Sequence, residues 1–203
     1  LLAAGLKVVD LSADFRFESV RLYEETYGVK HRAPELNPDV PYGSPELWRE
    51  GLRGKRAIAN PGCHSLTAIL GLAPLMKRGD ALDLDRIAVN SLTGVSGGGR
   101  NPSPAFHFPE CNESARAYGV ASHRHRPEIE EQLGRLRGGQ VRLVFTPILV
   151  PMNRGILSCI TVPLRREVTT AQALEWYREF YAGEPFMRVL GEGEVPSTAQ
   201  VFM

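Results

Sequence analysis

The sequence predicts an α/β fold in which the end of a parallel α/β domain is followed by a larger α+β domain with a mixed, partly antiparallel sheet. Three observations support this class. The apolar run LKVVDL, residues 6–11, follows a short helical turn, as in a βαβ unit. A second short strand, residues 56–59, leads through a turn into an apolar helix. Two longer strand-like segments, 141–150 and 156–164, favour antiparallel strands in the second domain.

The first domain is expected to cover residues 1–62. It begins with LLAAG, which resembles the last turn of a helix closed by Gly5. The continuous apolar character of residues 6–11 predicts a strand buried on both faces of a parallel sheet. Residues 19–27 predict a short helix, and residues 33–46, which contain four prolines, predict a loop.

The second domain is expected to cover residues 63–203, and its patterns alternate between helix and strand. Its first helix starts at Cys63 and carries apolar positions that would face a core. The other expected elements are a strand at 85–95, a Gly/Pro-rich loop at 97–109, a helix at 127–136, strands at 141–150 and 156–164, a helix at 169–181 and the start of a strand at 200–203.

Composition narrows the functional class. The chain has 203 residues, is 43% hydrophobic and carries a formal charge of +1, so it can bury a sizeable core but offers no strong field for nucleic acid or an anionic membrane. No apolar run is long enough to span a membrane. The three cysteines are odd in number and widely spaced, which argues against a disulfide framework and favours a reducing, cytoplasmic setting.

Cys63 is the first candidate for chemistry. It follows a predicted buried strand and the turn Asn60-Pro61-Gly62, so it would lie in the first turn of a helix. Unpaired N–H groups and the positive end of the helix dipole favour a thiolate there, and the thiolate is the nucleophilic form. From these residues alone a packing role for Cys63 is favoured over a catalytic one, since free cysteines are often buried.

His123 and His125 form the second candidate group. If this segment is extended, residues two apart point to the same side, so both imidazoles could face one cleft. A thiolate paired with a histidine is a common device for acyl chemistry. From the pair alone a solvated basic turn is favoured, and half of a zinc site completed by a cysteine is the least favoured alternative, because no CxxC or HExxH pattern accompanies it.

Anion-binding patterns are a third group. The segment GVSGGGR, residues 94–100, lets backbone N–H groups approach an anion, with Arg100 supplying charge, although a flexible linker is an equal alternative. Arg16 and Arg154 follow predicted strand ends, where a guanidinium could hold a carboxylate or phosphate through two hydrogen bonds. Surface salt bridges are the alternative for both arginines.

Five segments in order together resemble the N-acetyl-gamma-glutamyl-phosphate reductase family. They are VVDLSADFR (8–16), ANPGC (59–63), TGVSGGGR (93–100), HFPECNESARAYGVASHRHRPEI (107–129) and TPILVPMNRGIL (146–157). The resemblance implies the remnant of a Rossmann-type NADP-binding domain followed by a substrate domain of the semialdehyde-dehydrogenase type. It also implies an NADP-dependent acyl-phosphate reductase of arginine biosynthesis, which acts on a small molecule as a homo-oligomer. The family's glycine-rich Rossmann turn would precede Leu1, so we expect the chain to be a fragment.

The resemblance also assigns roles. The Cys63 thiolate attacks the gamma-carbonyl, phosphate leaves, and NADPH reduces the resulting thioester to an aldehyde. By match to the family's motifs, His125 is the acid/base and His123 its neighbour, although their order could be reversed. The loop near the nicotinamide corresponds to Ser96, Gly97 and Gly98, and the substrate-binding residues correspond to Arg16, Arg100, Tyr118 and Arg154.

The sequence departs from the family pattern beside the nucleophile. His64 occupies a position where the family usually has an aromatic residue. Such differences leave the thiol chemistry intact but keep a second substrate open, the carrier-protein-linked aminoadipyl phosphate of lysine biosynthesis. A non-catalytic zinc module built from Cys63, His123 and His125 is the alternative from another functional class.

Overall fold

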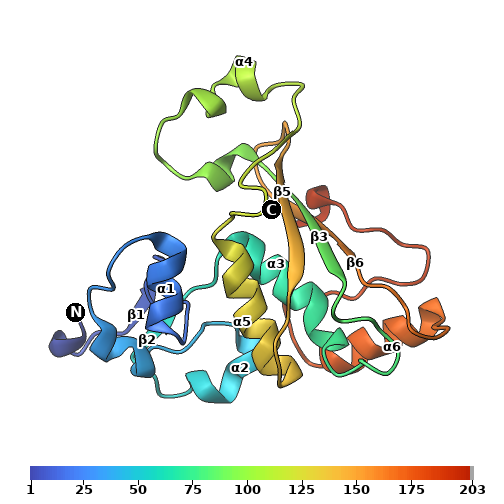
Figure 1. Ribbon diagram of the computed structural model, residues 1–203, viewed down its shortest axis with the longest axis horizontal. Helices are drawn as coiled ribbons and strands as arrows, with labels where there is room; N and C mark the ends of the chain where they lie inside the picture. The colour runs from blue at the N-terminus through green and yellow to red at the C-terminus, as the bar shows by residue number, and fades with distance from the viewer. Residues whose placement is uncertain (202–203) are drawn as a thin grey trace.

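The computed structural model describes residues 1–201 and divides the strands between two sheets (Figure 1). The smaller sheet pairs β1 (Val8–Asp10) with β2 (Ala57–Ala59) in parallel. The larger sheet has the order β4-β5-β3-β6. Its strands are β3 (Ile87–Thr93), β4 (Arg116–Ala117), β5 (Leu143–Leu149) and β6 (Ile156–Thr161). Because β3 runs parallel to β5 and antiparallel to β6, the predicted mixed sheet and α/β class are confirmed.

The predicted burial of the first strand is wrong. β1 is paired in parallel as expected, but the Val9 side chain is 63% exposed, and Leu6 and Leu11 on either side of the strand are also exposed. Only β2 pairs with β1 among the described residues, so a two-stranded sheet leaves part of this apolar run uncovered. The apolar pattern therefore predicts the strand and its pairing but not its surroundings.

Two helices lie between β1 and β2 in the chain. α1 (Val20–Tyr27) begins where Ser19 accepts a hydrogen bond from the backbone N–H of Leu22, in agreement with the expected helix. α2 (Pro45–Leu52) lies within and beyond the segment expected to be loop, which also contains a 3-10 helix at Pro34–Asp39. The missed signal for α2 is a serine followed by proline at the first helical position.

The core lies between the four-stranded sheet and three helices. These are α3 (Cys63–Leu72), α5 (His125–Arg137) and α6 (Thr170–Phe180), which starts with a capping box formed by Thr169 and Gln172. α3 contacts α5, β3 and β6, and its residues Ile69 and Leu72 are fully buried. Alternate strand residues, Val89 on β3 and Phe145 on β5, complete this core.

The opposite face of the large sheet is uncovered. Strand residues that alternate with the core positions point to this face. The exposed ones are Asn90, Val144, Cys159 and Thr161, and Asn90 is directly paired with Cys159. We call this surface the open sheet face. Among residues 1–201, no helix is long and apolar enough to cross a membrane.

The connection between β3 and α5 is more structured than the expected loop. It contains 3-10 helices at Val95–Gly98 and Pro104–Phe106, followed by the short helix α4 (Phe108–Cys111). Figure 1 shows this segment extending away from the sheet and returning to it before α5. The remaining 3-10 helices are Leu2–Ala4, Ala73–Leu75 and Thr198–Val201. The strand expected at 200–203 is therefore a 3-10 helix up to Val201, and its last two residues lie outside the described chain.

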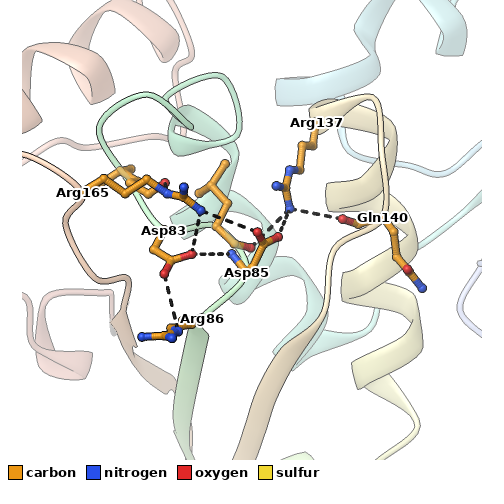
Figure 2. Close-up of polar contacts among 8 residues, drawn as sticks. Asp83, Asp85, Arg86, Arg137, Gln140 and Arg165 are labelled. Atoms are coloured by element: carbon orange, nitrogen blue, oxygen red, sulfur yellow. Dashed lines mark hydrogen bonds and ion pairs between the residues drawn. The ribbon is translucent and has the colours of Figure 1, made fainter.

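A network of ion pairs joins the C-terminal end of α5 to the start of β3 (Figure 2). Arg137 Nη1 lies 2.8 Å from Asp85 Oδ1, and Arg165 Nη2 lies 3.1 Å from Asp83 Oδ1. Arg86 also pairs with Asp83, at 3.6 Å. We call these five residues the Arg/Asp network; it links α5, the turn before β3 and the segment after β6.

Candidate active site

Cys63 is the first residue of α3, where the sequence places it. β2 ends at Ala59, the turn Asn60-Pro61-Gly62 follows, and the N–H of Leu66 donates to the Gly62 carbonyl to close the first helical turn, at 2.8 Å. The Cys63 side chain is exposed, while its neighbour His64 is buried. The fold therefore presents a free thiol at a helix start, beside N–H groups that have no partner within the helix.

Glu128, in the first turn of α5, holds the turn before Cys63 in place. Its Oε1 accepts hydrogen bonds from the Gly62 N–H, at 2.9 Å, and from the Tyr42 hydroxyl, at 2.8 Å. Arg16 lies 3.8 Å from Oε2, and its Nε donates to the Asn60 carbonyl at 2.8 Å. Glu128 is fully buried, which raises its pKa, while the Arg16 charge opposes that rise. The Cys63 turn is thus fixed to α5 through one carboxyl group.

Three histidine rings gather next to the Cys63 turn. The centroid of His125 lies 4.8 Å from His123 and 5.8 Å from His64, and His64 lies 5.6 Å from His123. A Cβ added to Gly62 would lie 2.5 Å from His125 Nε2, so a side chain there would displace the imidazole. Glycine before the cysteine therefore lets His125 approach the Cys63 turn closely.

Burial keeps these imidazoles neutral near pH 7. It lowers the pKa of His64 to about 4 and of His123 to about 4, with smaller effects from the neighbouring His123 and Arg124 charges respectively. Burial, followed by the charges of His123 and His64, lowers the pKa of His125 to about 3. Each histidine can therefore hold one proton on one ring nitrogen and accept on the other.

The segment that carries His123 and His125 is not the extended one that the sequence argument assumed. His125 starts α5, and its N–H donates to His123 Nδ1 at 3.2 Å. The side chain of His123 thus folds back over the helix start, which brings the two rings together in a different way. Because Nδ1 accepts this bond, neutral His123 carries its proton on Nε2.

Tyr118 completes the cluster from the end of β4. Its hydroxyl lies 2.8 Å from His64 Nε2, and its backbone N–H donates to the Pro147 carbonyl on β5. Burial raises the pKa of Tyr118 to about 12, and the nearby Cys63 contributes to the rise. Tyr118 is therefore a neutral phenol beside the thiol at physiological pH.

The predicted nicotinamide loop follows directly from β3. Ser96, Gly97 and Gly98 form an exposed 3-10 helix, and the Ser96 N–H donates to the Asn153 carbonyl at 3.1 Å. Ser96 and Arg154 line one shallow surface pocket. Within residues 1–201, no hydrogen bond links this pocket to Cys63 or the histidines.

The arginines predicted to bind substrate have different surroundings. Arg16 is only 11% exposed and is engaged with Asn60 and Glu128, so its geometry suits support of the Cys63 turn. Arg100 and Arg154 are exposed, in the segments that follow β3 and β5. The structure thus brings Cys63, the two histidines and Tyr118 together, with Arg16 behind them and the other two arginines on the surface.

Two geometric findings bear on the alternatives. Among residues 1–201, no three His, Cys, Asp or Glu side chains are placed to hold a metal ion, so the geometry does not support a zinc module. A cavity of about 680 Å³ is lined by Arg16, Tyr42 and Trp48 among others, but by neither Cys63 nor the histidines.

Local sequence patterns do not identify the groups that hold the site together. Glu128, which binds the Gly62 N–H, lies 66 residues after Gly62 in the chain. Tyr42, which binds Glu128, lies before Gly62. No local sequence pattern predicts contacts between residues so far apart. His64 drew notice only as a departure, yet its Nδ1 lies 2.7 Å from Ser91 Oγ. The sequence signal for Glu128 is weak: it is an acidic residue directly before Ile129, an apolar residue that the structure shows to be buried.

Comparison with known proteins gives a consistent result. The family model described as semialdehyde dehydrogenase, dimerisation domain, matches residues 63–203. Curated relatives named N-acetyl-gamma-glutamyl-phosphate reductase include those of Moorella thermoacetica, 48% identical over 98% of this chain, and Methanopyrus kandleri, 47% identical over 97%. The chain spans 57% and 56% of the length of these two relatives.

Solved structures agree on the fold. Aspartate semialdehyde dehydrogenase II of Vibrio cholerae, in complex with ASA, is 16% identical with a TM-score of 0.64, over 98% of this chain and 59% of that protein. A probable aspartate-semialdehyde dehydrogenase of Pseudomonas aeruginosa is 19% identical with a TM-score of 0.58, over 97% of this chain and 59% of that one. These structures show a shared fold, and the family match over residues 63–203, more than half of the chain, establishes that the chain belongs to the semialdehyde dehydrogenase family.

Proposed function

We propose that the full-length protein reduces N-acetyl-gamma-glutamyl phosphate to N-acetylglutamate 5-semialdehyde with release of phosphate, using NADPH, in arginine biosynthesis. The observation that carries this proposal is the exposed Cys63 thiol at the start of α3, beside a cluster of histidines that burial keeps neutral. The names of the curated relatives support the choice of substrate.

The first step is acyl transfer to sulfur. The Cys63 thiolate attacks the gamma-carbonyl carbon, a C–S bond forms, and the C–O bond to phosphate breaks, so that phosphate leaves with the electron pair. The carbonyl oxygen becomes negative during this attack, and the unpaired N–H groups of the first turn of α3 can stabilise it. The hydrogen bond from the Gly62 N–H to Glu128 keeps this turn in place.

The second step is reduction of the thioester. NADPH, when bound, supplies the hydride that converts the thioester to the aldehyde level. Hydride addition leaves an alkoxide oxygen on the thiohemiacetal. His125, as the acid/base, shares the proton of its neutral ring with this oxygen and takes it back as the C–S bond breaks, which releases the aldehyde and the Cys63 thiolate. His123 contacts the His125 ring and carries its proton on Nε2, which supports a role in which it would exchange protons with the substrate side of the cluster.

The surface pocket beside Ser96 suits part of the cofactor. It offers the Ser96 hydroxyl, the Asn153 side chain and the Arg154 guanidinium, a donor set that fits a polar or anionic group. Ser96, Gly97 and Gly98 would lie beside the nicotinamide, and Arg100 and Arg154 would hold phosphate or carboxylate. The G-x-G-x-x-G pattern of a dinucleotide-binding turn does not occur in these 203 residues, so most of the cofactor's contacts belong to other parts of the protein.

We also assign residues 1–62 to the end of the dinucleotide-binding domain and residues 63–203 to the substrate domain, a division that the range of the family match supports. The protein would act as a cytoplasmic homo-oligomer. The open sheet face, with the exposed Val144, is the surface where two copies would pair, as the dimerisation-domain match suggests. Sedimentation of the full-length protein tests this arrangement.

The decisive experiment runs the reaction backwards in the full-length protein. Purified enzyme is given N-acetylglutamate semialdehyde, phosphate and NADP, and formation of NADPH is followed by absorbance. We expect a signal that requires phosphate, because phosphate cleaves the thioester. Cys63→Ser should lower the rate by at least ~10³-fold with little change in fold, since a hydroxyl is a far weaker nucleophile of similar size.

The controls separate the substrate from the mechanism. A folded enzyme that binds NADP but turns over only carrier-linked aminoadipate semialdehyde would replace the proposed substrate with the lysine-pathway one. A Cys63→Ser variant that keeps most of its activity would overturn the thioester mechanism for either substrate.

A further inference from the structure

A chain of hydrogen bonds runs from Tyr118 through the buried His64 into the core. The Tyr118 hydroxyl lies 2.8 Å from His64 Nε2, and His64 Nδ1 lies 2.7 Å from Ser91 Oγ. Ser91 Oγ lies 2.9 Å from Ser158 Oγ, and Ser158 Oγ lies 3.1 Å from Thr67 Oγ1. The five groups come from β3, β6, α3 and the end of β4.

The Thr67 end of this series of hydrogen bonds fixes the direction of every bond in it. The Thr67 hydroxyl lies 3.0 Å from the His64 carbonyl, which can only accept, so Thr67 donates its single proton there. Thr67 must then accept from Ser158. Ser158, having given its only proton, must accept from Ser91, because a hydroxyl carries one proton.

The same count sets the protonation of His64. Ser91 has donated to Ser158, so it must accept from His64, which places the His64 proton on Nδ1. His64 is neutral near pH 7, because burial lowers its pKa to about 4. Its Nε2 therefore has a free lone pair and must accept the proton of the Tyr118 hydroxyl.

This order determines what Tyr118 offers to a ligand. A phenol whose proton is already donated presents only oxygen lone pairs, so it can accept a hydrogen bond but not donate one. Tyr118 is half-buried and lies near enough to Cys63 for the thiol to affect its pKa. The acceptor thus faces the region where the acyl group of the substrate would bind.

We propose that His64 is a positioning residue that fixes Tyr118 as a hydrogen-bond acceptor for an N–H group of the substrate, such as the amide of an N-acylated amino acid. The proposal rests on the proposed function for the identity of the substrate. The hydrogen-bond order itself does not depend on that function, so the two can be tested separately.

The first test measures the His64 tautomer directly. Nitrogen NMR of the full-length protein labelled at histidine separates protonated from unprotonated ring nitrogens near pH 7, and His64→Phe identifies the signals. We expect a proton on Nδ1 and none on Nε2. Ser91→Ala removes the group that accepts the Nδ1 proton, so it should shift the population toward the Nε2–H form. A wild-type His64 with its proton on Nε2 would overturn the proposal.

The second test asks whether His64 acts through Tyr118. In the reverse assay, His64→Phe and Tyr118→Phe should each raise KM for N-acetylglutamate semialdehyde about 5- to 10-fold, the usual loss for one hydrogen bond, with a smaller change in kcat. The double variant should be no worse than Tyr118→Phe alone, because the same bond is lost in both. Thermal unfolding of each variant checks that the fold is kept.

The outcomes distinguish the two proposals. Multiplied KM effects in the double variant, with an active wild type, would overturn the role of His64 while leaving the proposed function in place. A wild type inactive with this aldehyde would remove the proposed substrate, and the NMR result would still decide the hydrogen-bond order.

Discussion

The two ends of α5 hold their charged and titratable side chains in opposite ways. At the start, His125 and Glu128 are packed against the Cys63 turn, and His125 Nδ1 and Glu128 Oε2 have no hydrogen-bond partner among the described residues. At the other end, Arg137 pairs with Asp85 at the surface, within the Arg/Asp network shown in Figure 2. One helix thus carries a fully buried carboxyl group near its start and a partly exposed, ion-paired arginine at its end.

The difference shows that the fold keeps the titratable groups of the candidate site apart from the ion pairs that join its segments. Burial without partners moves pKa values far from their ordinary range, and such shifts gather at functional sites. The helix dipole acts in the same direction, since its positive end disfavours protonated His125 and its negative end favours Arg137. Exposed ion pairs contribute little free energy to folding. The Arg/Asp network therefore joins segments of the fold without forming a reactive site.

The largest expected contrast lies in catalysis. His125→Asn in the full-length protein should lower kcat in the reverse assay by ~10²–10⁴-fold, the usual contribution of a general acid or base. His123→Asn is the matched variant at the neighbouring histidine, and we expect a smaller loss of kcat there. If His123→Asn costs more than His125→Asn, the two roles are exchanged.

Glu128 provides the next test, through stability. Glu128→Ala removes the acceptor of the Gly62 N–H and the Tyr42 hydroxyl, and two buried donors without a partner should cost roughly 2–4 kcal/mol of unfolding free energy. Glu128→Gln keeps an oxygen acceptor and removes a buried charge, so it should stay near the wild type. Urea unfolding measures both. Equal losses in the two variants would mean that the Arg16 pair, rather than the two hydrogen bonds, stabilises the turn.

The buried histidines also predict a pH dependence. An unfolded histidine has a pKa near 6.5, whereas that of folded His64 is about 4, so between these values the unfolded state binds more protons. The contribution of His64 to the free energy of unfolding is therefore fully present above pH 6.5 and is lost as the pH falls toward 4. From pH 7 to pH 5, His64 alone should account for about 2 kcal/mol. Urea unfolding at both pH values should show a smaller loss in His64→Phe, and an identical loss would contradict the assignment.

The position of the nucleophile could be predicted from the sequence, whereas the residues that hold it in place could not, for a physical reason. A strand, a turn and an apolar helix are local patterns, so the position of Cys63 at the start of α3 could be predicted. The proximity of His123 and His125 was also expected, but from an extended segment that is in fact a helix start. Glu128 acts across 66 residues of chain, and the fold alone decides which residue faces the Gly62 N–H.

The smallest effect is expected at the other end of α5. Asp85 is exposed, and the Arg137 charge beside it holds its pKa below the usual range. Because an exposed ion pair is weak and screened by salt, Asp85→Asn should change the unfolding temperature only slightly, and that change should vanish at 1 M salt, where the screening length is about 3 Å. Activity should equal that of the wild type, since the network lies at the far end of the helix from Cys63. A loss of kcat in Asp85→Asn that persists in high salt would show that the two ends of α5 are coupled, and the separation drawn between them would fail.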